Sequence, residues 1–84
     1  MMEQAMPLRV RRILAEVFSL PIESIAPESS PQTIEAWDSV GHLNLVLALE
    51  QEFQVQFSPD DIEAMVSAEQ IVNTLNRARP SGTL

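Results

Sequence analysis

The segment from Ser39 to Phe53 constrains the fold most, because it has the pattern of a helix that is apolar around most of its circumference. Asp38 or Ser39 can cap its start. Its apolar residues are Val40, Leu43, Leu45, Val46, Leu47, Leu49 and Phe53. At about 100° per residue they cover well over half of the circumference, whereas a helix resting on one core needs a stripe only a little wider than about 100°. Either this helix is central to a bundle, or part of its apolar face serves a partner.

Three other segments carry helical signals. Residues 7–19 have apolar side chains at the i, i+3, i+4, i+7, i+8 spacing of an amphipathic helix. A cap, a proline and two acids in order start a short helix at Ser58. Ser67 and Gln70 form a capping-box pattern that opens a last helix, which Pro80 stops. With no strand pair visible, we expect an all-α fold: a small four-helix bundle of three main helices and one short helix.

A long loop separates the first two predicted helices. Residues 20–37 contain three prolines, and their apolar residues match neither the helical nor the strand period. Four spaced apolar anchors argue for an ordered loop: Ile22, Ile25, Ile34 and Trp37. We therefore expect one domain over residues 1–84, with an ordered core at about 7–79 and a tail at 80–84.

Charge and cysteine content exclude several classes of function. The chain has no cysteine, so disulfides, thiolate metal sites and a thiol nucleophile of its own are excluded. All five basic residues are arginines near the ends, and eleven carboxylates lie between Glu16 and Glu69, within a net charge of −7. This block disfavours nucleic acid and favours partners with basic docking patches. With no signal peptide or membrane span, we expect a cytoplasmic monomer.

The junction of the long loop and the apolar helix carries the chemistry. Asp38-Ser39-Val40 resembles the Asp-Ser-Leu attachment motif of the acyl carrier protein family, with Val in place of Leu. The resemblance continues through residues 47–53, 57–62 and the last helix, so it covers nearly the whole chain. It implies a carrier without catalytic activity. A pantetheinyl transferase would attach phosphopantetheine from coenzyme A to Ser39, and acyl groups would ride on the arm as thioesters.

The resemblance also implies roles for the neighbours of Ser39. Asp38 would help the transferase and its magnesium engage the site, besides capping the helix. A patch facing acyl-loading and acyl-transfer enzymes, flanked by acids, would comprise Val40, Leu43, Leu47, Glu50 and Glu52. The opposing interpretation assigns all the apolar residues to the core. Many family members have further acids beside the serine where this chain has Gly41, His42 and Asn44, which argues against generic fatty acid synthesis enzymes as partners.

Other interpretations of the same residues stay open. Ser39 could be only an N-cap, and Trp37 a core aromatic that pins the loop. Asp38, Ser39 and His42 could suggest a hydrolase triad, but no oxyanion hole or substrate pocket is indicated. The main competitor is an acidic helical interaction module without a prosthetic group. A calcium site fails because Val40 and Leu43 occupy positions that need an oxygen ligand and a glycine, so we expect no metal. The sequence does not name the cargo.

Overall fold

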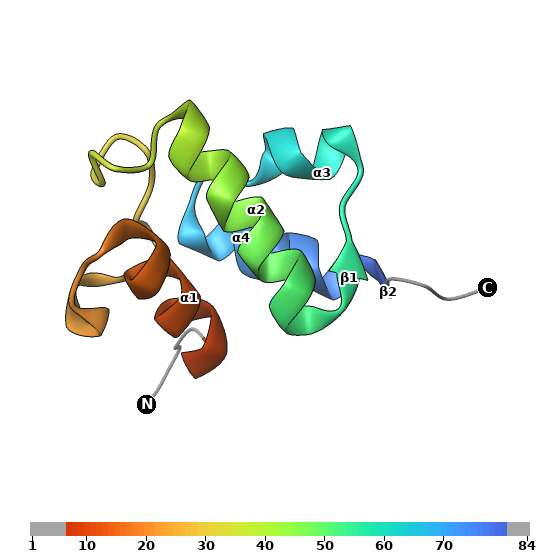
Figure 1. The fold of residues 1–84 in the computed structure, drawn as a ribbon, viewed down its shortest axis with the longest axis horizontal. Helices are drawn as coiled ribbons and strands as arrows, with labels where there is room; N and C mark the ends of the chain where they lie inside the picture. Colours follow the sequence, from red (N-terminus) through yellow and green to blue (C-terminus); the bar gives the residue numbers. More distant parts are fainter. Residues whose placement is uncertain (1–6, 81–84) are drawn as a thin grey trace.

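The computed structural model describes residues 7–80, which form a small helical bundle (Figure 1). In chain order the elements are α1 (Leu8–Phe18), a 3-10 turn η1 (Ile22–Ser24), α2 (Ser39–Phe53), β1 (Val55–Gln56), α3 (Pro59–Ala64), α4 (Ala68–Arg77) and β2 (Arg79–Pro80). The expected fold of three main helices and one short helix is confirmed. The bounds predicted for the apolar helix match those of α2.

Local capping signals set the helix ends. α1 ends where Ser19 adopts a left-handed conformation (φ 57°) and its N–H turns back toward the last carbonyls of the helix. α3 begins with a full capping box. The Ser58 side chain accepts a hydrogen bond from the Asp61 N–H, and the Asp61 side chain accepts one from the Ser58 N–H. Ser67 caps α4 by accepting a hydrogen bond from the Gln70 N–H. The caps at Ser58 and Ser67 were predicted because these signals are short-range, whereas the left-handed conformation of Ser19 was not predicted, and of the capping box predicted at Ser67 and Gln70 only the Ser67 half is present.

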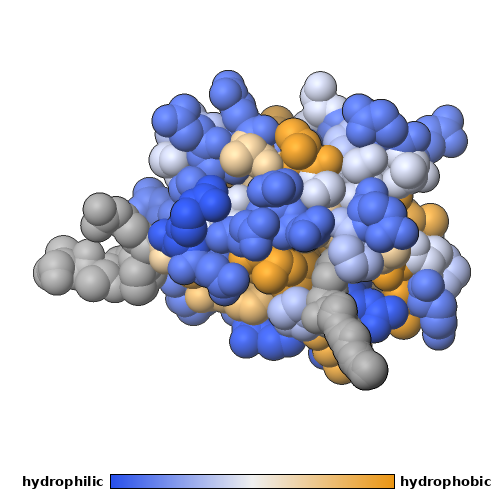
Figure 2. Space-filling view, turned by 180° about the vertical axis from the view of Figure 1, so that it is seen from behind, coloured by the Kyte–Doolittle hydropathy of each residue, from blue (hydrophilic) through white to orange (hydrophobic). Residues whose placement is uncertain are grey.

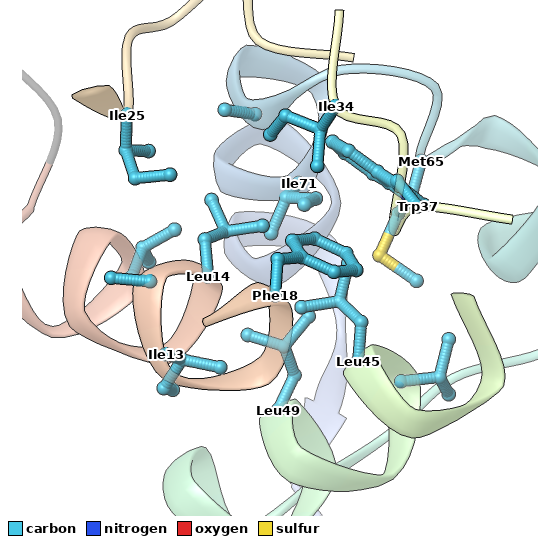
Figure 3. Close-up of a cluster of buried hydrophobic side chains, with 14 of the residues drawn as sticks. Ile13, Leu14, Phe18, Ile25, Ile34, Trp37, Leu45, Leu49, Met65 and Ile71 are labelled. Atoms are coloured by element: carbon cyan, nitrogen blue, oxygen red, sulfur yellow. The ribbon is translucent and has the colours of Figure 1, made fainter. Parts of the chain in front are cut away.

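α2 crosses the middle of the molecule, and one side of it forms part of the core (Figure 1). Leu45, Val46 and Leu49 are buried there. They meet side chains of α1, of the long loop and of α4, including Leu14, Phe18, Trp37 and Ile71 (Figure 3). Phe53, at the last residue of the helix, is only partly buried against the core. The helix is therefore central, but its core face takes only some of its apolar residues.

The long loop is ordered by the apolar anchors that the sequence indicated. Ile25, Ile34 and Trp37 are buried, and Ile22 packs partly against the core. The loop also serves α4, because the carbonyls of Ser29 and Pro27 accept hydrogen bonds from the N–H groups of Ala68 and Glu69 at 2.8 and 2.9 Å. These bonds satisfy N–H groups that a helix start leaves without partners.

A short strand pair corrects the expectation that no strands pair. β1 and β2 are antiparallel, with Val55 opposite Pro80 and Gln56 opposite Arg79. Pro80 therefore belongs to the ordered part of the chain and not to the predicted tail, whose other residues, 81–84, lie outside the described residues. The pairing joins segments far apart in sequence and too short to show a strand period. Within residues 7–80, no helix has the length and apolarity needed to cross a membrane.

Candidate functional site

The start of α2 presents Ser39 without using its side chain. Asp38 is the N-cap, and its Oδ1 accepts a hydrogen bond of 2.8 Å from the Gly41 N–H. Ser39 is exposed, and its hydroxyl has no hydrogen-bond partner among residues 7–80. Because Asp38 takes the capping role, the interpretation of Ser39 as only an N-cap is wrong. The hydroxyl is free to react.

Gly41 lets the loop approach the first turn of α2 closely. The residue is buried, and a Cβ placed on it would collide with the Ala36 carbonyl oxygen and lie 3.2 Å from Cε1 of Phe18. Only a residue without a side chain leaves room for this contact. In the sequence, Gly41 was distinguished only as a position where many family members have an acid. A glycine in the first turn of an otherwise strong helix was the available signal.

An open groove lies beside Ser39, which we call the Ser39 groove. It has a volume of about 550 Å³, and apolar surface makes up most of its wall. The residues that line it are Pro31, Trp37, Asp38, Ser39, His42 and Leu43. The loop and the first turns of α2 thus place an apolar surface next to an exposed hydroxyl.

His42 is engaged away from Ser39. Its Nδ1 lies 2.9 Å from Nε1 of Trp37, and its Nε2 lies 2.8 Å from the Ile62 carbonyl oxygen. With both ring nitrogens occupied, the imidazole has none left to accept a proton from Ser39. Asp38 is likewise committed to the helix cap. The triad interpretation therefore finds no support in the geometry.

Three apolar side chains of α2 face solvent, and one of them, Leu43, also lines the Ser39 groove. Val40, Leu43 and Leu47 are 66%, 58% and 57% exposed, and we call them the α2 patch. The interpretation that all apolar residues of this helix belong to the core is therefore wrong. The face seen from behind in Figure 2 is mainly hydrophilic, with smaller apolar areas between the polar side chains. Exposed leucines and valine grouped on one helix are typical of an interaction surface.

The two acids predicted to flank this patch both have partners inside the chain. Glu50 is partly buried, and its Oε2 accepts a 3.0 Å hydrogen bond from the Phe57 N–H. Glu52 forms an ion pair of 3.2 Å with Arg9. A second terminal arginine, Arg77, lies 3.9 Å from a carboxylate oxygen of Asp61. Two of the terminal arginines, Arg9 and Arg77, thus lie against carboxylates of the acidic block, which the sequence order concealed.

No group of three potential metal ligands among histidines and acids comes together in the part of the chain that the structure describes. The candidate site consists of the free Ser39 hydroxyl, the start of α2 capped by Asp38, the Ser39 groove and the α2 patch.

Comparison with known proteins gives this arrangement a context. A family model described as a phosphopantetheine attachment site matches residues 8–75. Acyl carrier protein 3 of Ralstonia nicotianae is 29% identical over 73 residues, covering 87% of this chain and 84% of its own. An acyl carrier protein of Campylobacter jejuni subsp. doylei is 27% identical over 70 residues, covering 83% and 91%.

A solved structure shows the same fold. The solution structure of a holo acyl carrier protein from Geobacter metallireducens superimposes with a TM-score of 0.75 at 24% identity, covering 86% of this chain and 85% of that one. Proteins of this kind are carriers of a covalently attached phosphopantetheine group and are not enzymes. Since the family model spans most of the sequence, this chain belongs to the phosphopantetheine attachment family, as an acyl carrier protein.

Proposed function

We propose that this chain carries acyl intermediates as thioesters on a phosphopantetheine arm attached to Ser39. It would present them to enzymes of a fatty acid, polyketide or related biosynthetic pathway. The observation that carries the proposal is the exposed, unbonded hydroxyl at the first residue of α2, directly after the residue that caps the helix. The arm would supply the thiol that the cysteine-free chain lacks.

The surroundings of Ser39 fit such a group. The phosphodiester would lie at the start of α2, where backbone N–H groups point outward and the helix dipole is positive. The Gly41 N–H is taken by Asp38, which leaves the N–H groups of Ser39 and Val40 nearest to the added charge. The apolar Ser39 groove offers a surface on which the uncharged part of the arm can rest.

Asp38 would act in attachment as well as in capping. Only its Oδ1 takes part in the cap, and the carboxylate is exposed beside Ser39. A carboxylate in this position is a suitable ligand for the hard Mg²⁺ ion that a phosphoryl-transfer reaction requires. We therefore include Asp38 in the surface that the transferase recognises.

The partner-binding surface would be the α2 patch of Val40, Leu43 and Leu47, with acids at its margin. These three side chains lie on the same helix as the attachment point and are not required by the core. Glu50 and Glu52 stay in the predicted partner surface, although their internal bonds reduce what they can offer a basic docking patch. A cytoplasmic location and a monomeric state are part of the same proposal.

Mass spectrometry tests the attachment directly. The wild-type protein, incubated with coenzyme A, magnesium and a promiscuous transferase, should gain the mass of one phosphopantetheine, and Ser39→Ala should gain none. Since Asp38 provides the cap, Ser39→Ala should alter the free energy of unfolding by no more than about 0.5 kcal/mol.

Ser58→Ala is the matched control, because Ser58 also begins a helix but is itself the cap. This variant should be modified as fully as the wild type while losing about 1 kcal/mol of stability. Modification of Ser39→Ala, or no modification of the wild type under conditions that modify another carrier, would disprove the proposal.

A further inference from the structure

His42 joins the segment before Ser39 to the third helix. Its half-buried imidazole is bonded to Nε1 of Trp37 at 2.9 Å and to the Ile62 carbonyl oxygen at 2.8 Å. The indole N–H can only donate and the carbonyl can only accept. The partners therefore require a neutral imidazole whose Nδ1 accepts and whose Nε2 carries the proton. We call the chain of groups from Trp37 through His42 to the Ile62 carbonyl the His42 relay.

The indole end of the relay is fixed in the core. Trp37 is 2% exposed and stacks on Phe18 of α1, with ring centroids 5.3 Å apart and planes at 27°. The His42 ring meets the N–H edge of the indole, with its centroid 6.2 Å from that of the indole and the planes at 17°. The hydrogen bond thus links α2 to the indole, which itself stacks on α1.

The carbonyl end of the relay lies on the short helix α3. α3 has six residues, and the Ile62 carbonyl in its last turn accepts only a long backbone hydrogen bond of 3.4 Å from the Met65 N–H, so the shorter bond from His42 is its better one. Across residues 7–80, the bond from His42 is the sole hydrogen bond between α2 and α3. One imidazole therefore connects the loop, α2 and α3.

The relay surrounds the attachment point. Trp37 lies two residues before Ser39 and His42 three residues after it, and all three line the Ser39 groove. We propose that His42 is a positioning residue, which holds the loop and α3 against the first turn of α2 so that partner enzymes meet a preformed surface around Ser39. This inference rests on the proposed function of Ser39. A surface ordered in advance spares the partner the entropic cost of ordering it during binding.

Two substitutions of His42 separate the ends of the relay. In His42→Asn the amide oxygen replaces Nδ1 and can accept from the indole, but nothing reaches the Ile62 carbonyl. In His42→Gln the amide nitrogen replaces Nε2 and can donate to that carbonyl, but the indole loses its acceptor. Trp37→Phe removes the indole donor and keeps an aromatic ring in the stack. Ser67→Ala is the control for lost stability, because it removes a helix cap outside the relay.

The first readout needs no prosthetic group. Trp37 is the one tryptophan of the chain, so its indole N–H gives one resonance in a ¹⁵N–¹H spectrum. His42→Gln should shift this resonance and speed its exchange with water by at least about tenfold, since a buried donor without an acceptor is poorly held. His42→Asn should stay close to the wild type, and so should Ser67→Ala.

The second readout is the kinetics of phosphopantetheine transfer to Ser39, measured where every variant is folded. Both His42 variants and Trp37→Phe should raise the transferase KM for the carrier by about five- to tenfold and change kcat by less than about twofold. Ser67→Ala should change neither constant. KM should change more than kcat because the His42 relay orders the surface that the transferase binds and does not touch the reacting hydroxyl of Ser39.

The outcomes distinguish this inference from the function on which it rests. Unchanged KM values in both His42 variants, with a modified wild type, would overturn the positioning role alone. A raised KM in His42→Gln with an unaltered indole resonance would also overturn it, because His42 would then contact the transferase directly. A wild-type protein that accepts no group at Ser39 would overturn both.

Discussion

Replacing Gly41 by alanine tests the close packing of the loop against the first turn of α2. The added Cβ would collide with the Ala36 carbonyl oxygen and press on the Phe18 ring. Ala36 cannot move freely, since its neighbour Trp37 is buried and donates its backbone N–H to the Ile34 carbonyl at 3.0 Å. The loop must therefore shift as a unit, and the shift would pull the segment that leads into Ser39.

Two effects of opposite sign decide the size of the change. Alanine favours a helix over glycine by up to about 1 kcal/mol. Overpacking a filled interior costs about 1 to 3 kcal/mol. Because the obstacle is a backbone oxygen and not the end of a flexible side chain, we expect the upper part of that range and a net loss of about 1 to 2 kcal/mol. For a domain of this size each kcal/mol lowers Tm by about 4 to 8 °C.

Urea unfolding followed by the fluorescence of Trp37 would measure the loss, with a thermal melt as a second probe. Asn44→Ala is the matched control, since it places the same side chain on an exposed position one turn further along α2. It should gain up to about 0.5 kcal/mol from helix propensity alone. If Gly41→Ala were as stable as the wild type or more stable, the loop would not be packed on this turn as described.

Three further outcomes are expected. Leu49→Ala truncates a fully buried side chain and should lower the free energy of unfolding by about 2 to 5 kcal/mol. Leu47→Ala changes a side chain that is 57% exposed and should lower it by under about 1 kcal/mol, yet slow acyl transfer. Equal melting temperatures of the two variants would place both residues in the core. Arg9→Gln should cost about 1 kcal/mol, because Arg9 pairs with Glu52 and lies 4.4 Å over the Phe53 ring; a loss unaffected by added salt would disprove the ionic part. Association with the transferase should slow as salt is added, because the net charge is −7, and a rate constant independent of ionic strength would contradict this.

The features predicted from the sequence were those with short-range signals. The bounds of α2 and the start of α3 at the Ser58 cap depend on residues within one or two turns of each other, so pattern and propensity suffice to identify them. The burial of Ile25, Ile34 and Trp37 followed from their spacing in an otherwise polar, proline-rich loop. The division of α2 into a core face and an exposed face followed from an apolar arc wider than one core can use.

The features that were missed depend on contacts between distant segments. The pairing of β1 with β2, the Arg9–Glu52 ion pair and the bond from His42 to Ile62 join residues 20 or more positions apart. Each is set by how the helices pack, which no local pattern specifies. His42 illustrates the difference, because its spacing from Ser39 suggested a shared chemistry, whereas its ring is held by residues of the loop and α3.

The charges of the protein act mainly on the approach of a partner and less on its final contact beside Ser39. From Ser39 to Leu49 the helix contains no acid and no arginine or lysine, and its exposed side chains include the α2 patch. Two of the acids nearest to the C-terminal end of α2 are already bonded within the chain. The net negative charge can therefore speed the encounter with a basic partner, because long-range steering depends on the summed field. Contact beside Ser39 itself must be made largely by apolar surface, so a partner would need an apolar docking site there and its basic residues further out.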